Sequence, residues 1–419
     1  MNGKLSARIL NPFRWWILLL LVLMTGGIIG GVLVFARGLV ITNLSDLVPW
    51  GLWIAIDLSS IALSAGAFLL SAAVYLLGLR RFQPVARTAV FIGLIGYSMA
   101  LMTLLLDIGR PDRFWHALAF WNPHSPLWEV TMCVALYLSV LVLETAPIFA
   151  RFAWLRQRWP RLTQRLEHVH KLAPALAIAG LCLSMLHQSS LGATYGILKA
   201  RPIWYQPGLP VLFIISAAVA GPALTILASM LAARLSPRLA VVKDDLLAQL
   251  ARFVGWGLLL YLYLRFWDVL AMSYTYEPGR TEGLQLLTRG SLAFNFWIGE
   301  ILLGAVVPAF ILLTPRLRQK PLPRMVALLC VVGGLVAYRW DVNMVGQLVV
   351  FAHLPQGIVP QYTHYTPSLV EWGTGLGIIA YGLLAFTLGV RHLRVVDHTP
   401  EPHPIPVEAQ PALALAGTD

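Results

Sequence analysis

Ionisable side chains recur inside long apolar runs of this sequence, where a hydrocarbon environment would not solvate them. A charge at such a position is costly unless it faces a protein interior, a water-filled cavity or a partner of opposite charge. Each one is therefore a candidate for binding, proton transfer or a structural ion pair. These residues are Asp57, Asp107, Glu129, Glu144, His187, Arg265, Asp268, Glu300, Arg339, Asp341 and Glu371.

Their spacing suggests specific partners. Glu300 and Arg339 fall on consecutive, oppositely directed apolar runs, so we expect them to form a buried ion pair, either purely structural or part of a proton path. Arg265 and Asp268 are three residues apart, share a helix face and could satisfy each other. Glu144 has no basic neighbour within its run, which makes it a candidate for taking up protons.

Two further segments, 106–126 and 186–205, place His, Asp and Tyr beside Trp. A quinone headgroup requires donors to its two carbonyls, groups that pass protons, and a flat apolar wall for its ring. We expect both segments to begin at the end of an apolar run and to continue as outer loops. A loop that only packs over a helix bundle would also be rich in Pro and Trp, so both interpretations stay open.

The elements that position these residues are membrane helices. Hydrophobic residues make up 58% of the chain and charged residues only 12%, with a mean hydropathy of +0.72, whereas soluble domains are roughly 25% charged. A run of roughly 20 apolar residues spans a bilayer, which predicts an all-α, polytopic bundle of about ten helices. The expected spans are 15–36, 49–78, 88–107, 126–150, 172–192, 208–233, 253–274, 291–313, 325–348 and 368–390. The first lacks a small-residue cleavage site, so we expect a retained helix.

The basic charge follows this topology. Alternate loops, starting with the N-terminus, hold 22 of the 31 Lys and Arg residues, which predicts that both termini are cytoplasmic. The surplus is a topology signal and does not indicate nucleic-acid binding. We expect a cytoplasmic N-terminus (1–14), a transmembrane domain (15–392) and a disordered, Pro-rich cytoplasmic tail (393–419).

The sequence offers no evident electron carrier. Cys133, Cys182 and Cys330 each stand alone, which disfavours an Fe–S cluster or zinc site. Of ten histidines, only His187 falls within an expected span, whereas a b-type haem usually needs axial His ligands on facing helices. We expect no haem, no Fe–S cluster and no metal in this chain, so electrons would be exchanged with a separate subunit.

Several motifs resemble the NrfD/PsrC family of quinone-reactive membrane subunits, and most closely its ten-helix HybB type, the membrane subunit of a periplasmic [NiFe] hydrogenase. They are PWGLWIAID (49–57), AGA (65–67), DIGRP (107–111), WNPHS (121–125), LHQSSLG (186–192), WY (204–205), FWIGE (296–300) and YRWDVN (338–343). The Tyr-rich form of the His187 motif found in shorter relatives is absent, and the Pro-rich tail is not a family feature.

The resemblance implies a cofactor-free subunit, built around four-helix bundles in a bacterial or archaeal cytoplasmic membrane. Such a subunit exchanges electrons between a quinone, menaquinone rather than ubiquinone, and an extracytoplasmic ferredoxin-like [4Fe-4S] subunit. That Fe–S subunit in turn exchanges electrons with a catalytic hydrogenase or molybdopterin subunit. The quinone pocket would involve Asp57, Asp107, Arg110, His124, Glu129, His187, Gln188, Trp204 and Tyr205. The proton route would involve Glu144, Glu300, Arg339 and Asn343.

Two other functions compete with this one. A redox-inactive membrane anchor needs helices but no buried carboxylates. A secondary transporter also buries charges, but it predicts inverted repeats with Gly- or Pro-broken helices in matching places of two halves, and we find no convincing pair of such helices in the sequence.

Overall fold

The computed structural model of the protein describes residues 12–76, 78–150, 152–235, 242–355, 357–393 and 395. Within them, ten helices are long and apolar enough to cross a membrane, which confirms the expected polytopic, all-α fold. The predicted N-terminal segment and tail lie almost wholly outside the described residues. The spanning helices are α2 (Pro12–Arg37), α3 (Leu52–Leu76), α4 (Gln83–Asp107), α6 (Pro126–Ala150), α9 (Ala173–Gly196), α10 (Leu209–Leu235), α11 (Asp244–Thr275), η5 with α13 (Asn295–Val306 and Val307–Leu313), α15 (Pro321–Val345) and α16 (Leu369–His392).

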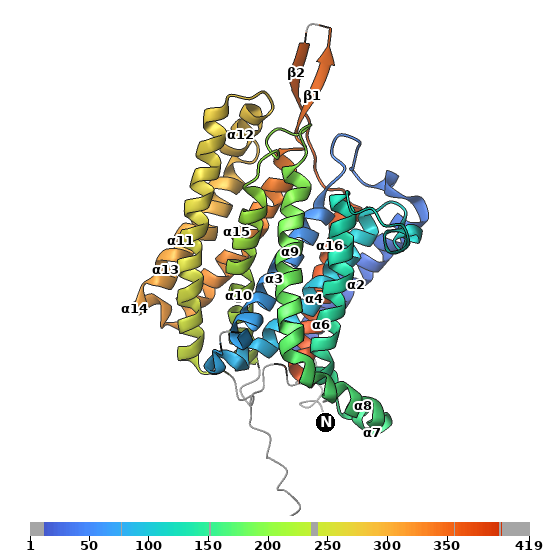
Figure 1. Cartoon of the computed structure of the whole chain (residues 1–419), viewed down its shortest axis with the longest axis vertical. Helices are drawn as coiled ribbons and strands as arrows, with labels where there is room; N and C mark the ends of the chain where they lie inside the picture. The colour runs from blue at the N-terminus through green and yellow to red at the C-terminus, as the bar shows by residue number, and fades with distance from the viewer. Residues whose placement is uncertain are drawn as a thin grey trace, which may run out of the picture.

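The spanning helices form two four-helix bundles (Figure 1). The first bundle contains α3, α4, α6 and α9, and the second contains α10, α11, η5 with α13, and α15. Helix α10 packs against both α3 and α9 and so joins the bundles. Helices α2 and α16 pack on each other beside the first bundle. Only 17% of the most apolar stretch of α2 is buried, so this helix mainly faces lipid.

The two ends of the helical body differ. At one end, which we call the hairpin end, the antiparallel hairpin of β1 (Val349–Leu354) and β2 (Gly357–Tyr362) projects beyond the helices (Figure 1). At the opposite end, the tail end, two short helices project sideways from the bundle (Figure 1). These are α7 (Ala153–Arg158) and α8 (Pro160–His168). The remaining short helices are α5 (His116–Ala119), α12 (Arg280–Thr288) and α14 (Pro315–Arg318).

Several spanning helices are longer than predicted, among them α4, which begins at Gln83 rather than at 88. Helix α9 continues to Gly196, four residues beyond the predicted end at 192, so the segment 186–192, which we expected to lead into an outer loop, lies wholly within the helix. His187 and Gln188 suggested a loop because they are polar, but both are buried against neighbouring helices and do not end the helix. Helix α11 begins at Asp244, where two acidic residues in its first turn favour the positive end of the helix dipole.

The eighth spanning helix begins as a π-helix. Residues Asn295–Val306 adopt this geometry over 12 residues before α13 continues as an α-helix. π-Helical segments are rare and are frequently found at functional sites. Gly304 in this segment lies against Gly334 of α15 without room for a Cβ atom on either residue. The two backbones therefore touch, and the π-helix carries Glu300 into the protein interior.

A second glycine contact joins the two bundles. A Cβ atom on Gly66 of α3 would collide with the backbone of Ala217 in α10, and one on Gly221 of α10 would collide with the backbone of Gly66 and Ala67. Small residues let membrane helices approach closely enough for backbone packing. The relative position of the bundles thus depends on the absence of side chains at this crossing.

We expect Gly66→Ala and Gly221→Ala each to destabilise the protein by about 1–3 kcal/mol or more, because overpacking against backbone cannot be relieved by a change of rotamer. Thermal unfolding in detergent measures the effect. Gly333→Ala is the matched control, since a Cβ atom there meets nothing within 4 Å. Equal melting temperatures for all three variants would contradict the assigned crossing.

Candidate functional site

His187 lies at the centre of a buried polar cluster in the first bundle. Its Nδ1 atom forms a hydrogen bond with the hydroxyl of Tyr97 from α4, and both side chains are fully buried. The Nε2 atom of His187 has no hydrogen-bond partner among the described residues. When the Tyr97 hydroxyl donates to Nδ1, the neutral ring carries its proton on Nε2. The cluster then presents one buried donor that is free to bind a ligand.

A row of carboxyl groups leads from this cluster toward the hairpin end. Asp57 of α3 is only 2% exposed, and its Oδ1 atom has no partner in the described part of the chain. Its charge lies close enough to act on the hydroxyls of Tyr97 and Tyr195 and on Asp107 at the end of α4. Asp107 in turn lies within electrostatic reach of Glu371. Acidic groups from three helices thus form a row between Tyr97, the partner of His187, and the hairpin end.

Glu371 ends this row as a well-anchored group. Its Oε2 atom accepts hydrogen bonds from the backbone N–H groups of Ser368, at 2.8 Å, and Asn43, at 3.1 Å. Its Oε1 atom accepts from the Tyr365 hydroxyl, which itself accepts from the N–H of Leu52 at 2.9 Å. Burial and the hydrogen bond to Glu371 raise the pKa of Tyr365, so this phenol remains a donor. The contacts fasten the start of α16 to the start of α3.

Arg339 brings a positive charge to the seam between the bundles. Its Nη2 atom donates to Gln188 Oε1, to Ser216 Oγ and to the carbonyl of Phe213, each at 3.1 Å. Its guanidinium lies 3.6 Å from the centre of the Phe213 ring. The Nε and Nη1 atoms of Arg339, and Nε2 of Gln188, have no hydrogen-bond partner within the described residues. The expected ion pair of Arg339 with Glu300 was therefore wrong.

Glu300 instead pairs with Arg265 of α11. The Nε and Nη2 atoms of Arg265 donate to the two carboxylate oxygens of Glu300 at 2.7 and 3.3 Å, and Tyr261 donates to Oε1 at 2.7 Å. The third nitrogen of Arg265 bonds to Asp268, which confirms the expected pairing of these two residues. Glu300 does not pair with Arg339 because the Glu300 side chain faces α11, whereas the Arg339 side chain reaches α9 and α10. One buried arginine thus serves two carboxylates.

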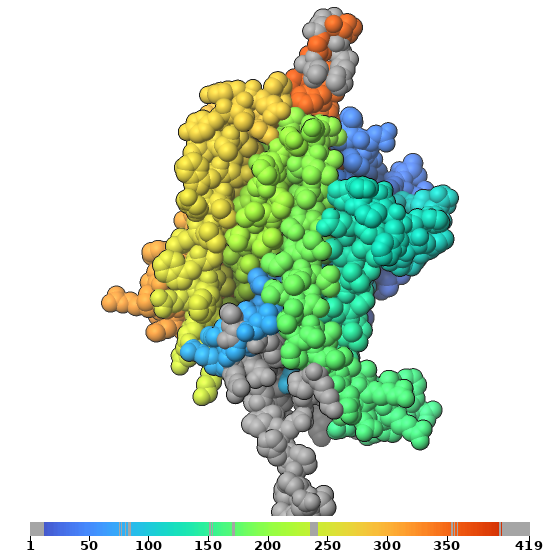
Figure 2. All heavy atoms as spheres, in the orientation of Figure 1, coloured from blue at the N-terminus to red at the C-terminus, as the bar shows by residue number. Residues whose placement is uncertain are grey.

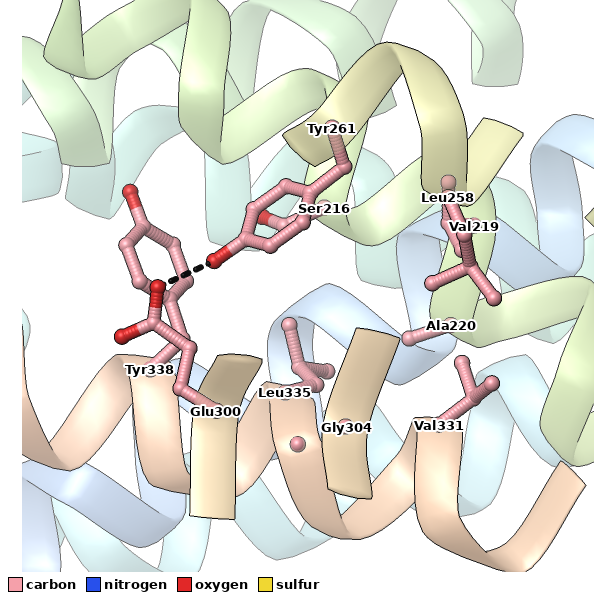
Figure 3. Close-up of a pocket in the computed structure, with 11 residues that line it drawn as sticks. Ser216, Val219, Ala220, Leu258, Tyr261, Glu300, Gly304, Val331, Leu335 and Tyr338 are labelled. Carbon is pink, nitrogen blue, oxygen red and sulfur yellow. Dashed lines mark hydrogen bonds between the residues drawn. The ribbon is translucent and has the colours of Figure 1, made fainter. Parts of the chain in front are cut away.

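A small cavity connects the two arginine sites. It has a volume of about 20 Å³ and is lined by the polar side chains of Ser216, Tyr261, Glu300 and Tyr338 (Figure 3). A cavity needs roughly 10–15 Å³ of such volume to hold one water molecule. Ser216 also binds Arg339, so this site lies between the two arginines. A second cavity of about 20 Å³ reaches Arg265 from the other side, beside Asp341 and Gln206.

A line of hydroxyl groups in the first bundle leads from His187 toward the tail end. The rings of Tyr97 and Tyr137 lie 4.5 Å apart, and the Tyr137 hydroxyl has no described partner. Glu144 follows Tyr137 by seven residues, two turns along the same face of α6, and its charge acts on that hydroxyl. The tyrosines were not predicted from the sequence, although the seven-residue spacing before Glu144 was a usable signal.

Other predicted pocket residues have different surroundings. Arg110 is exposed and pairs with Asp112 at 3.0 Å. His124 and Tyr205 also lie exposed at the hairpin end. The structure does not bring these three to His187. Glu129 is half-buried and accepts a hydrogen bond of 2.8 Å from Ser190 of α9.

Trp204 and Asn343 have bridging positions. Trp204 is buried, stacks on Trp50 at 5.9 Å, and donates from Nε1 to the carbonyl of Val342 at 2.6 Å. Asn343 donates to the carbonyl of Trp50 at 2.9 Å and accepts from Tyr195 at 3.0 Å. These contacts tie the start of α3, the end of α9 and α15 together, so Asn343 is occupied by structural hydrogen bonds.

The comparisons with known proteins identify the family. The sequence pattern of the family described as "Polysulphide reductase, NrfD" matches residues 40–351. The chain belongs to the NrfD family. It is a multi-pass integral membrane protein, and the matched region includes His187, Arg265, Glu300 and Arg339. Among the described residues, no group of three or more His, Cys, Asp or Glu side chains is arranged to hold a metal ion.

Relatives match almost the whole length. The chain is 32% identical to the menaquinone reductase integral membrane subunit of Nitratidesulfovibrio vulgaris, over 94% of each chain. It is 29% identical to a selenate reductase subunit of Mesobacillus selenatarsenatis, over 90% of this chain and 93% of the relative. It is 25% identical to the "Probable Ni/Fe-hydrogenase 2 b-type cytochrome subunit" of Escherichia coli, over 87% of each.

The shared role of Arg265 leads to a ranked prediction. Arg265→Met leaves two buried carboxylates without a cation and should cost about 3–5 kcal/mol of stability. Glu300→Gln leaves Arg265 paired with Asp268 and should cost less, about 1–3 kcal/mol. Unfolding temperatures of the purified variants in detergent check the order. A larger loss for Glu300→Gln would show that Arg265 is not the centre of the cluster.

Proposed function

We propose that the protein is the quinone-reactive membrane subunit of a respiratory oxidoreductase complex. The observation that carries this proposal is a set of unpartnered, buried polar atoms on α3 and α9 of the first bundle and on α15 of the second. Among the described residues these are Nε2 of His187, Oδ1 of Asp57, Nε2 of Gln188, and Nε and Nη1 of Arg339. A buried polar group without a partner costs free energy, so such a set favours a site whose partner is a ligand.

The chemistry of these groups suits a quinone. Reduction of a quinone to a quinol takes up two electrons and two protons, and negative charge develops on the carbonyl oxygens. His187 can donate from Nε2 to one carbonyl, and Asp57 can exchange a proton. The positive charge of Arg339, held by Gln188, stabilises negative charge in this water-poor interior. The two internal cavities, of about 20 Å³ each, are too small to hold a quinone ring.

Electrons would come from, or go to, a partner at the hairpin end. The bias of Lys and Arg supports an extracytoplasmic position for this end, in a bacterial or archaeal cytoplasmic membrane. The hairpin and its flanks, 346–368, contain no Asp, Glu, Lys or Arg, which suits contact with another protein better than with water. A ferredoxin-like [4Fe-4S] subunit, which exchanges electrons with a hydrogenase or molybdopterin subunit, would dock here. The name of the Nitratidesulfovibrio relative favours menaquinone as the quinone.

The electron path needs no haem in this chain. The name of the Escherichia coli relative includes a b-type cytochrome, but His187 is the one histidine within the interior of the described spans, and its Nδ1 is bonded to Tyr97. A second axial histidine on a facing helix is missing from these interiors. We therefore keep a cofactor-free subunit as the proposal.

Proton supply would follow the buried polar residues. The line Glu144, Tyr137, Tyr97 leads from the tail half of the first bundle to His187. In the second bundle, Glu300 borders the cavity that Ser216 connects to Arg339. Asn343 would support this path by fixing the helices rather than by carrying protons. Coupling of the redox step to proton translocation would use these groups.

His187→Ala and Asp57→Asn should lower quinone-linked turnover of the intact complex by about 100-fold, the scale of losing a positioned acid–base group. His392→Ala and Asp112→Asn are matched controls, because both residues are exposed and lie away from His187. Activity with a soluble electron acceptor should be unchanged in all four. Wild-type quinone turnover in both site variants would instead favour a redox-inactive anchor, and solute uptake without redox partners would favour a transporter.

Glu144→Gln and Glu300→Gln should each lower proton uptake per electron in vesicles that contain the reconstituted complex. Glu167→Gln is the matched control, because this exposed glutamate lies on α8 outside the bundles. A pH-sensitive dye on the tail side follows the uptake. Unchanged stoichiometry in both variants would contradict the proton path while leaving the quinone site untouched.

A further inference from the structure

The connection between α6 and α9 projects sideways from the tail end of the helical body (Figure 1). It contains α7, α8 and a 3₁₀ turn over Val169–Leu172, which we together call the arm. In the space-filling view the arm protrudes beside the spanning helices (Figure 2). Helix α6 ends at Ala150 and α9 begins at Ala173, so the arm lies at the level where the spanning helices leave the bilayer.

One side of α8 is basic. Arg161, Gln164, Arg165 and His168 follow one another at the spacing of a single helix face and line a shallow, open groove. Neither Arg161 nor Arg165 forms an ion pair with a described residue, whereas Arg156 of α7 pairs with Glu167 at 3.4 Å. This groove therefore presents positive charge that no described residue neutralises through an ion pair.

Another side of α8 is apolar and uncovered. Trp159 is 53% exposed and Leu162 is 39% exposed, and Leu166 follows one turn later. Trp154 of α7 is 59% exposed, with its ring 6.3 Å from that of Trp159. A short helix with a basic face and an apolar face containing Trp and Leu is typical of segments that lie in the membrane interface. The arm contains such a helix and lies at the level of the membrane interface.

We propose that the arm lies on the bilayer surface and binds the headgroups of anionic phospholipids through Arg161 and Arg165. Trp159 and Leu162 would enter the boundary between headgroups and acyl chains. A soluble anion would account for the arginines but would leave the apolar side in water. An anionic lipid satisfies both sides at once, and each basic side chain near such a surface strengthens binding by roughly fivefold.

Hydrogen exchange of the full-length protein in nanodiscs tests this proposal. Amides of 153–172 should exchange more slowly in discs that contain phosphatidylglycerol than in discs of phosphatidylcholine alone. Arg161→Gln with Arg165→Gln should abolish this difference, since the binding constant falls roughly 25-fold. Arg113→Gln with Arg289→Gln removes two exposed arginines at the hairpin end and should keep it. Trp159→Ser with Leu162→Ser should speed exchange in both kinds of disc.

Unchanged exchange of the arginine variant in phosphatidylcholine discs shows that α8 still folds, which keeps the comparison interpretable. Equal protection of the wild-type arm in both kinds of disc would overturn the proposal. Protection by inorganic phosphate in phosphatidylcholine discs, equal to that by phosphatidylglycerol, would also overturn it and assign the groove to a soluble anion.

Discussion

The burial of Arg265 and Arg339 among membrane-spanning helices constrains much of this structure. A guanidinium in a lipid environment must be surrounded by acceptors or counter-charges, and the two arginines meet this demand differently. Arg265 holds two carboxylates, so its charge is balanced within its own cluster by Asp268 and Glu300. Arg339 is held by an amide, a hydroxyl, a carbonyl and a ring, without a carboxylate among these contacts. The first arginine stabilises the second bundle, and the second keeps its charge available at the seam.

The contacts of Arg339 cross from the second bundle into the first and therefore depend on how closely the bundles approach. Its partner Gln188 is on α9, while Ser216 and Phe213 are on α10. The glycine crossing of α3 and α10 holds the bundles at backbone contact. Packing at the crossing and chemistry at the seam are linked through α10, because Ala217 at the crossing directly follows Ser216, a partner of Arg339. A small residue beside the candidate site can therefore be as important to it as a polar one.

The sequence predicted the architecture well because hydrocarbon thickness sets helix length and lipid excludes charge. All ten spans, the buried carboxylates and the pair Arg265–Asp268 follow from these two constraints. Which side chains pair between helices was not predictable in the same way. The direction in which Glu300 points depends on a π-helix, and this π-helix leaves no recognisable pattern in the sequence. Likewise, the polar residues around His187 suggested that the helix ends there, but it continues to Gly196. Tyr97, Tyr137 and Ser216 were missed because hydroxyls carry no charge and fit an apolar run.

The π-helix has a consequence for how this chain can vary. Each of its turns holds one residue more than an α-helical turn, so the segment behaves like a spanning helix with a built-in insertion. Loss of one residue between Glu300 and Gly304 would return the turn to α-helical register and rotate Glu300 by about 100° relative to the glycine contact with α15. The carboxylate would then leave Arg265 although every side chain of the cluster was still present. Alignments of this region should therefore be judged by helix register as well as by residue identity.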